Sequence, residues 1–165
     1  MGGFFGVVSK NDCVFDLFFG TDYHSHLGTK RAGLTVYGKG GFDRSIHSIE
    51  NSPFRTKFEH IFNEMFGTSA IGCISDFEPQ PLLIRSCIGT FAITTVGLVN
   101  NSKELIDQYL SFSGGHFAVH TGGRINSVEL VAALIDQKSS FAEGIRFAQS
   151  VIDGTASILI LKEDG

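Results

Sequence analysis

The chain has 165 residues, of which 42% are hydrophobic, and its mean hydropathy is +0.14. This length and composition indicate one folded domain and exclude an intrinsically disordered chain. The formal net charge is −4, and the lysines and arginines are scattered rather than clustered. That distribution excludes the concentrated basic surface that nucleic-acid binding requires.

The cysteines give no sign of a disulfide framework or a zinc site. Cys13, Cys73 and Cys87 are odd in number and show no Cys-x-x-Cys spacing. No apolar run reaches the roughly 18 residues of a membrane span, and the start has no basic segment followed by an apolar core. The sequence therefore predicts a cytoplasmic protein with no membrane partner, no nucleic-acid partner, no cofactor and no metal.

Hydrophobic periodicity predicts the elements of the first third of the chain. Asn11 and Asp12 are placed to cap a helix that carries Val14, Leu17 and Phe18 at helical spacing. The GKGG segment at residues 38–41 lies between two β-like runs and lacks the Lys-Ser/Thr of a P-loop, so it indicates a hairpin rather than a phosphate cradle. Strands are predicted at residues 3–9, 32–37 and 44–50.

Pro53 opens a charged amphipathic stretch that extends to Phe66. Its apolar residues recur on one side of a helix, which is typical of core packing rather than of a cofactor site. These residues are Phe54, Phe58, Ile61, Phe62 and Met65.

The second half is predicted to alternate strands and helices. Ser102 is placed to cap a helix that ends near Leu110, and Gly144 interrupts the last predicted helix. The predicted strands are residues 70–74, 89–95 and 156–161, and the two further helices are residues 127–136 and 141–152.

The last strand, residues 156–161, is almost continuously apolar, which favours a position buried on both faces. The sequence stops shortly afterwards at Gly165. Such a strand would leave an unpaired ladder and a bare apolar face. We therefore expect a longer chain or a partner to complete its sheet.

The first eight residues, MGGFFGVV, resemble the start of the class II glutamine amidotransferases, Met-Cys-Gly-(Ile/Phe)-Phe-Gly-(Ile/Val)-Val. In that family, removal of Met leaves a Cys whose thiol attacks glutamine and whose own amine acts as base. Gly2 occupies this position, and glycine has no side-chain atom that can serve as a nucleophile.

The resemblance runs in family order along essentially the whole chain and is greatest to the amidophosphoribosyltransferase branch, which makes phosphoribosylamine from glutamine ammonia in purine synthesis. Residues 71–76, IGCISD, are similar to the family's Ile-Gly-His-Val-Arg-Tyr, and residues 126–130, NSVEL, to its Ser-Asp-Thr-Glu-Val. The other similar segments are residues 26–34 (HLGTKRAGL), 78–81 (EPQP), 89–101 (GTFAITTVGLVNN), 104–105 (EL) and 154–161 (GTASILIL).

The resemblance implies an α+β fold, the four-layer αββα sandwich of the N-terminal-nucleophile hydrolases, in which two antiparallel sheets lie between helical layers. Residues 1–165 would be a class II glutamine-amidotransferase-type domain, about the first two thirds of it, and incomplete at the C-terminus. The expected partners are then the missing C-terminal part of the same protein, or a partner chain, and further copies in a homo-oligomer.

The resemblance also identifies the glutamine-binding and oxyanion-hole positions, and the family side chains that this sequence lacks there. In the family an Arg and an Asp hold the carboxylate and amine of glutamine, and an Asn-Gly pair forms the oxyanion hole. The corresponding residues are Ser75, Ser127, and Val96 with the retained Gly97. Loss of the Arg removes a bidentate carboxylate fork, and one oxyanion donor is worth about 2.7–4 kcal/mol of barrier.

Two functions follow as expectations. The first is the glutamine-amidotransferase domain of an amidophosphoribosyltransferase-like protein, inactive toward glutamine because Gly2 leaves the nucleophile position vacant. The alternative is a non-catalytic regulatory module on the same fold. It would bind L-glutamine, another small molecule or a protein through the former glutamine cleft or the sheet edge.

Other candidate residues have simpler interpretations. Cys73 lies in an apolar strand with no base nearby in the sequence, which favours buried packing over a substitute nucleophile. The pairs His24/His26 and His116/His120 have chelating spacings, but the glycines beside the second pair disfavour a helix that holds both on one face. Asp12, Asp16 and Asp22 are predicted to form a solvated helix face or caps, and the pairs Gly114-Gly115 and Gly122-Gly123 to bound a flexible loop.

Overall fold

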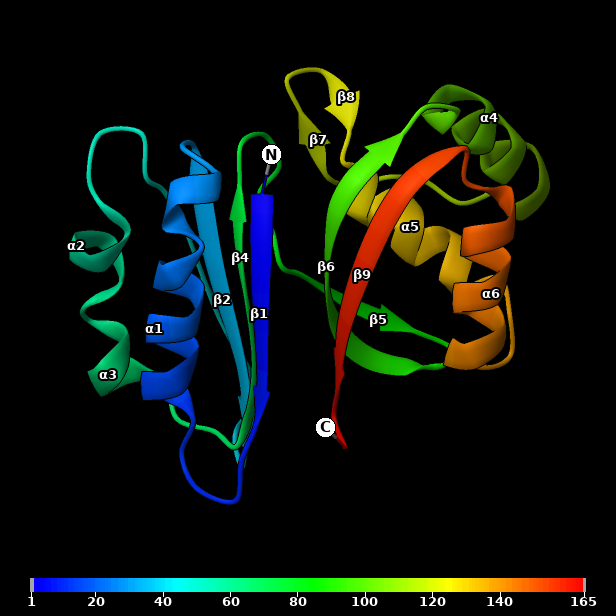
Figure 1. Cartoon of the computed structure of the whole chain (residues 1–165). Coiled ribbons are helices and arrows are strands. Elements are labelled where there is room, and N and C mark those ends of the chain that lie inside the picture. Colours follow the sequence, from blue (N-terminus) through cyan, green and yellow to red (C-terminus); the bar gives the residue numbers. More distant parts are fainter. Residues whose placement is uncertain (1, 165) are drawn as a thin grey trace.

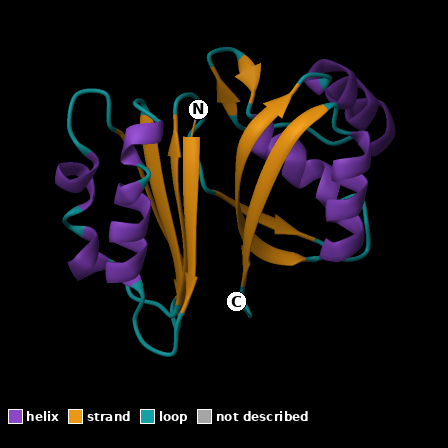
Figure 2. Ribbon diagram, viewed as in Figure 1, coloured by secondary structure: helices purple, strands orange, loops and turns teal. Residues whose placement is uncertain are grey.

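The computed structural model describes residues 2–164, so Met1 of the start motif and Gly165 lie outside the described residues. Two antiparallel sheets face each other, and helices cover the outer side of each one (Figures 1 and 2). This is the α+β, four-layer αββα arrangement that the resemblance implied. No helix in the described part of the chain is long and apolar enough to cross a membrane.

The first sheet has the strand order β1-β4-β2-β3, and all its neighbours are antiparallel. Its strands are β1 (Gly2–Val8), β2 (Arg31–Gly38), β3 (Gly41–Ser48) and β4 (Ser69–Ser75). The predicted hairpin is confirmed, because Gly38 pairs with Gly41 across a tight turn and Gly41 has a φ of +97°. A positive φ of this size suits glycine, which has no Cβ to clash.

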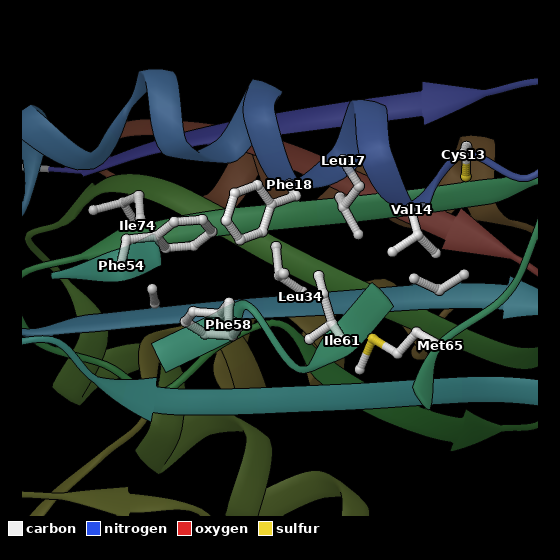
Figure 3. Close-up of a cluster of buried hydrophobic side chains, with 13 residues drawn as sticks. Cys13, Val14, Leu17, Phe18, Leu34, Phe54, Phe58, Ile61, Met65 and Ile74 are labelled. Carbon is white, nitrogen blue, oxygen red and sulfur yellow. The ribbon is translucent and has the colours of Figure 1, made fainter. Parts of the chain in front are cut away.

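The outer layer of the first sheet consists of α1 (Val14–Tyr23), the 3₁₀ turn η1 (Ser25–Leu27), α2 (Phe54–Phe58) and α3 (Ile61–Glu64). Side chains of α1, including Leu17 and Phe18, pack over Leu34 of β2 and Ile74 of β4 (Figure 3). Full burial of such a side chain contributes roughly 1.5–3 kcal/mol. This cluster is the core between the first sheet and its helices.

One prediction in this layer was wrong. Asp12 does not cap α1; its Oδ1 accepts a hydrogen bond from the Gly67 backbone N–H at 2.9 Å, and Cys13 stands at the N-cap with no side-chain hydrogen bond. The amphipathic stretch from Pro53 to Phe66 forms the two short helices α2 and α3. Its apolar side nevertheless faces the core, except that Phe62 is exposed and packs on Phe18 at a ring distance of 4.9 Å.

The second sheet has the order β5-β6-β9. Its strands are β5 (Leu82–Ser86), β6 (Gly89–Val99) and β9 (Gly154–Lys162), its helices are α4 (Ser102–Ser113), α5 (Ser127–Ile135) and α6 (Phe141–Val151), and a small hairpin joins β7 (His120–Thr121) to β8 (Arg124–Ile125). Ser102 is the first residue of α4 rather than its cap. Asn101 takes the cap position, and its side chain bonds Val151 O and Asp153 N instead of α4.

Strand β9 is covered on both faces, as its apolar sequence predicted. Ile158 and Ile160 pack into the core beneath α5 and α6, whereas Leu159 and Leu161 face the first sheet. Among the described residues its only strand neighbour is β6. Because the other edge is unpaired, Ile158, Leu159 and Ile160 are only half-buried.

His47, a partly buried residue of the edge strand β3, should make stability depend on pH. His47 of β3 lies 3.0 Å from Ser45 Oγ through Nε2, and its ring packs against Phe58 and against His60 at 5.5 Å. Burial, followed by the positive charges of His60 and Lys57, lowers the pKa of His47 below its usual 6.5. The unfolded chain therefore binds the proton more readily, so stability is lost as the pH falls below about 6.5.

We expect His47→Gln to flatten the decline in the free energy of unfolding between about pH 7 and about pH 5. Urea titrations at a series of pH values measure this slope. His116→Gln is the matched control, because His116 is exposed in a loop. An unchanged slope in His47→Gln would show that His47 is not the group that makes stability depend on pH.

Candidate functional site

A cleft of about 490 Å³ opens between the two sheets, where β1 begins and β4 ends. All five site positions predicted from the sequence line it: Gly2, Ser75, Val96, Gly97 and Ser127. The other lining residues are Ile74, Asp76, Phe77, Glu78, Gln80 and Thr95.

Strand register brings these positions together. Gly2 pairs directly with Ser75 in the β1–β4 ladder, and successive residues of a strand point to opposite faces of the sheet. Ser75 therefore lies on the same face of the first sheet as Cys73 and Ile71, the face that packs against the second sheet. Val96 and Gly97 come from β6 on the opposite side, and Ser127 is the first residue of α5.

Gly2 has no room for a side chain in this conformation. A Cβ built on Gly2 would lie 2.5 Å from the backbone oxygen of Ile74, well inside van der Waals contact. The backbone of β1 or β4 would have to move to accept any other residue. Residue 2, which the resemblance identified with the family nucleophile, thus has no side chain and no space for one.

Gly97 is retained for a reason that needs no catalysis. A Cβ at this residue would lie 1.9 Å from the backbone oxygen of Thr155 in β9, and its φ is +156°. Only glycine allows β6 and β9 to approach this closely.

We therefore expect Gly97→Ala to lower the free energy of unfolding by about 1–3 kcal/mol, which is the usual cost of overpacking. The loss can be larger here because the new Cβ would clash with a backbone atom, which cannot turn aside as a side chain can. Urea denaturation measures the change. Gly40→Ala is the matched control, since nothing lies within 4 Å of its Cβ position. Equal stability of the two variants would show that Thr155 of β9 does not lie this close to Gly97 of β6.

A carboxylate lies at the beginning of α5 even though Ser127 has none. Glu78 Oε1 accepts a hydrogen bond from the Ser127 backbone N–H at 2.6 Å, and Oε2 accepts one from Ser127 Oγ. A carboxylate is favoured at the N-terminus of a helix, where backbone N–H groups lack partners. Sequence reasoning missed this role of Glu78, and the only signal was its place as the first residue of the EPQP segment.

Ser75 holds the turn that carries Glu78 into the cleft. Its Oγ accepts hydrogen bonds from the backbone N–H groups of Phe77 at 3.2 Å and Glu78 at 3.1 Å. Asp76 follows in the same turn, and its Oδ1 accepts a hydrogen bond from the Thr29 N–H at 2.7 Å. None of the described lining residues is Lys, Arg or His, so the cleft wall carries acidic groups without a basic side chain.

The inner wall of the cleft is tied to the second sheet by Gln80. This buried side chain accepts hydrogen bonds at Oε1 from Thr94 Oγ1 and Thr95 N, at 2.8 and 2.9 Å, and donates one through Nε2 to Thr95 O at 3.1 Å. Three of the four hydrogen-bonding positions of this amide are therefore used within the structure. The cleft presents carboxylates and hydroxyls on a rigid frame, without the N-terminal thiol that the resembling family uses.

Cys73 is fully buried, which confirms the packing interpretation. Burial raises the pKa of its thiol to about 12, so the thiol remains protonated at neutral pH. Only the thiolate is a good nucleophile. Cys73 therefore does not replace the missing nucleophile.

The remaining candidates lie outside the cleft. Within residues 2–164 no group of three or more His, Cys, Asp or Glu side chains is arranged to hold a metal. Asp22 pairs with Arg55 at 2.8 Å. Gly114 ends α4 in the left-handed conformation, and Gly122 and Gly123 form the β7–β8 turn with positive φ. The segment between the two glycine pairs is a loop that ends in the short strand β7.

Comparison with solved structures found the same fold in enzymes of known structure, of which two are described here. The glutamine phosphoribosylpyrophosphate (PRPP) amidotransferase from B. subtilis, complexed with ADP and GMP, matches 99% of this chain with a TM-score of 0.83 and 22% identity. A structure described as the allosteric regulatory enzyme of purine biosynthesis matches 99% with a TM-score of 0.82 and 22% identity. This chain covers 35% and 36% of those chains, about a third of their length.

No family model matches the sequence, and no curated protein matches it. The likeness therefore rests on structure. It shows that the chain has the same αββα fold as these two structures.

Proposed function

We propose that residues 1–165 form a glutamine-amidotransferase-type domain of an amidophosphoribosyltransferase-like protein, from the purine-biosynthesis lineage. In this proposal the domain does not hydrolyse glutamine and keeps the cleft as a ligand pocket. The chain is about the first two thirds of such a domain and acts in the cytoplasm, where its three unpaired cysteines would stay reduced. The rest of the protein, or a partner chain, pairs with β9 in a homo-oligomer.

One observation carries the proposal. The cleft gathers all five positions that matter in the resembling family, yet Gly2 supplies no nucleophile and none of the five supplies a carboxylate-binding cation or an Asn oxyanion donor. An acyl transfer needs an activated nucleophile next to a base. Loss of these groups together, with the cleft retained, supports binding without turnover.

The second candidate is the non-catalytic regulatory module. The Glu78–Ser127 pair favours it, because a fixed carboxylate at the head of α5 gives the cleft a binding group of its own. The complete open reading frame discriminates between a domain of a larger transferase and an independent module. A phosphoribosyl-binding motif downstream would support the first.

The loss of glutamine chemistry is tested by incubating the chain with diazo-oxo-norleucine, followed by intact-mass and peptide mapping, and by assaying ammonia release from glutamine. We expect no adduct and no ammonia. Cys87→Ser is the matched control, because the exposed Cys87 thiol is the one that could react nonspecifically. A stoichiometric adduct on the N-terminal peptide would contradict the proposal.

A further inference from the structure

The outer side of helix α1 exposes aromatic residues to solvent. Phe15, Phe19 and Tyr23 recur every four residues, so they lie on one side of the helix. Their exposed fractions are 63%, 42% and 74%. Phe62 of α3 extends this surface, because its ring centroid lies 5.9 Å from that of Phe15 and its exposed fraction is 43%. We call these four residues the aromatic face.

The core of the first layer does not use the aromatic face. Val14, Leu17 and Phe18, on the opposite side of α1, are the residues that pack over the first sheet. A surface helix normally presents polar side chains to water. A covered aromatic side chain buries roughly 150–250 Å², so the exposed part of the aromatic face amounts to roughly 350–550 Å². The largest apolar patch of a monomeric protein is about this size and is often functional, and it supplies about half of the roughly 800 Å² that each partner buries in a stable interface.

The rim of the aromatic face is acidic. Residues 14–23 and 54–64, which form the helices of this layer (Figure 1), contain four carboxylates but only two lysine or arginine side chains: Asp16, Asp22, Glu59 and Glu64 against Arg55 and Lys57. Asp16 follows Phe15 directly and is exposed, and no side chain in the described part of the chain forms an ion pair with it. This rim favours a partner that carries positive charge.

The chain itself shows that this surface accepts a cation. The guanidinium of Arg55 pairs with Asp22 at 2.8 Å, and its Cζ lies 5.8 Å from the centroid of the Phe19 ring. A cation is stabilised both by the aromatic ring and by the carboxylate in such an arrangement. Asp16 lies on the other flank of the same aromatic stripe, as the helical repeat of about 3.6 residues places it. That flank combines a carboxylate with exposed rings but has no cation of its own.

We propose that the aromatic face is the docking site for an amphipathic helix of a partner protein. The apolar stripe of that helix covers Phe15, Phe19 and Phe62, and its lysine or arginine flank meets Asp16. A second copy of this chain fits less well, because pairing two aromatic faces also brings two acidic rims together. None of the four residues of the aromatic face lines the cleft, so the docking is independent of the function proposed for the cleft.

Two model helical peptides with the same leucine stripe test the charge of the partner. One carries lysines and the other carries glutamates on its polar side, and each contains a single tryptophan. Because the chain contains no tryptophan, the emission of the peptide reports binding, and the ¹⁵N amide shifts of residues 14–23 locate it. We expect the lysine peptide to bind at least about tenfold more tightly than the glutamate peptide, and added salt to reduce this difference.

Two variants test the docking surface. Phe15→Gln should weaken binding of the lysine peptide by about tenfold or more, because covered aromatic side chains carry much of the affinity of an interface. Phe112→Gln is the matched control, since Phe112 is 91% exposed on α4 in the other helical layer. Asp16→Lys should reverse the preference between the two peptides, whereas Asp107→Lys, at an exposed position of α4, should leave the preference in place. Residues 15 and 16 are both exposed, so neither variant removes a buried side chain.

Equal binding of the two peptides, or no binding of either, would overturn the proposal. Undiminished binding of the lysine peptide by Phe15→Gln would overturn it as well. Amide shifts in α1 that depend on the concentration of the chain itself, and that vanish in Phe15→Gln, would assign the aromatic face to a second copy and would also contradict the proposal. None of these results bears on the proposed function, which rests on the cleft.

Discussion

Gly2→Cys is expected to leave the chain without family-like glutamine hydrolysis. Ser75 offers no cation for the glutamine carboxylate, a loss of about 1.5–3 kcal/mol for one charge-assisted contact. Val96 offers no oxyanion donor, a loss of about 2.7–4 kcal/mol. Together these predict a kcat/KM lower by roughly a thousandfold to a hundred-thousandfold than that of an intact site. The close approach of Ile74 O to the new Cβ adds a steric penalty.

This prediction is tested by measuring kcat/KM from the release of ammonia from glutamine. Gly2→Ala is the matched control, because it adds a Cβ without a thiol. Adding Ser75→Arg and Val96→Asn to Gly2→Cys should recover activity stepwise, since each restores one missing contact. An ordinary glutamine kcat/KM in Gly2→Cys alone would show that Ser75 and Val96 do not occupy the positions assigned to them.

The 165-residue chain by itself is expected to self-associate through the open edge formed by β1 and β9. A cavity of about 330 Å³ lies between these strands, lined by residues that include Phe4, Val8 and Leu159. Partial exposure of the three aliphatic side chains at residues 158–160 forgoes roughly 2–4 kcal/mol of burial. That is large against a typical stability of about 5–15 kcal/mol.

Sedimentation velocity across a wide concentration range tests the association. Ser157→Lys places a charge on the exposed part of the β9 edge and should shift the chain toward monomer. Ser111→Lys, on the exposed side of α4, is the matched control. A monomeric parent chain that binds no hydrophobic dye would contradict the prediction.

An extension that supplies strands pairing with β9 should raise the melting temperature by roughly 5–15 °C, given about 2–4 °C per kcal/mol for a domain of this size. It should also reduce binding of a hydrophobic dye. An unchanged melting temperature would show that the extension does not cover this edge.

The sequence by itself predicted the elements whose local signals are strong. The hairpin at residues 38–41, the apolar strand β9 and the helices α5 and α6 follow from glycine placement and apolar periodicity, both of which act over a few residues. The resemblance placed Gly2, Ser75, Val96, Gly97 and Ser127 at one site, and the fold brings all five together.

Other features depended on contacts between distant residues. Strand β5 is short and carries Arg85 and Ser86, so pairing with β6 rather than its own pattern makes it a strand. Asp12 and Asn101 bind backbone outside their expected helices because tertiary partners compete with local capping.

The site shows the same division. The sequence identified which groups the cleft lacks, because the residue type at each position can be read directly from the sequence. That Glu78 places a carboxylate beside Ser127, and that Ile74 O closes the space beside Gly2, follows only from folding, which brings together residues 49 and 72 positions apart in the chain. These spatial contacts depend on how the two sheets and the start of α5 pack together, and no local sequence pattern predicts them.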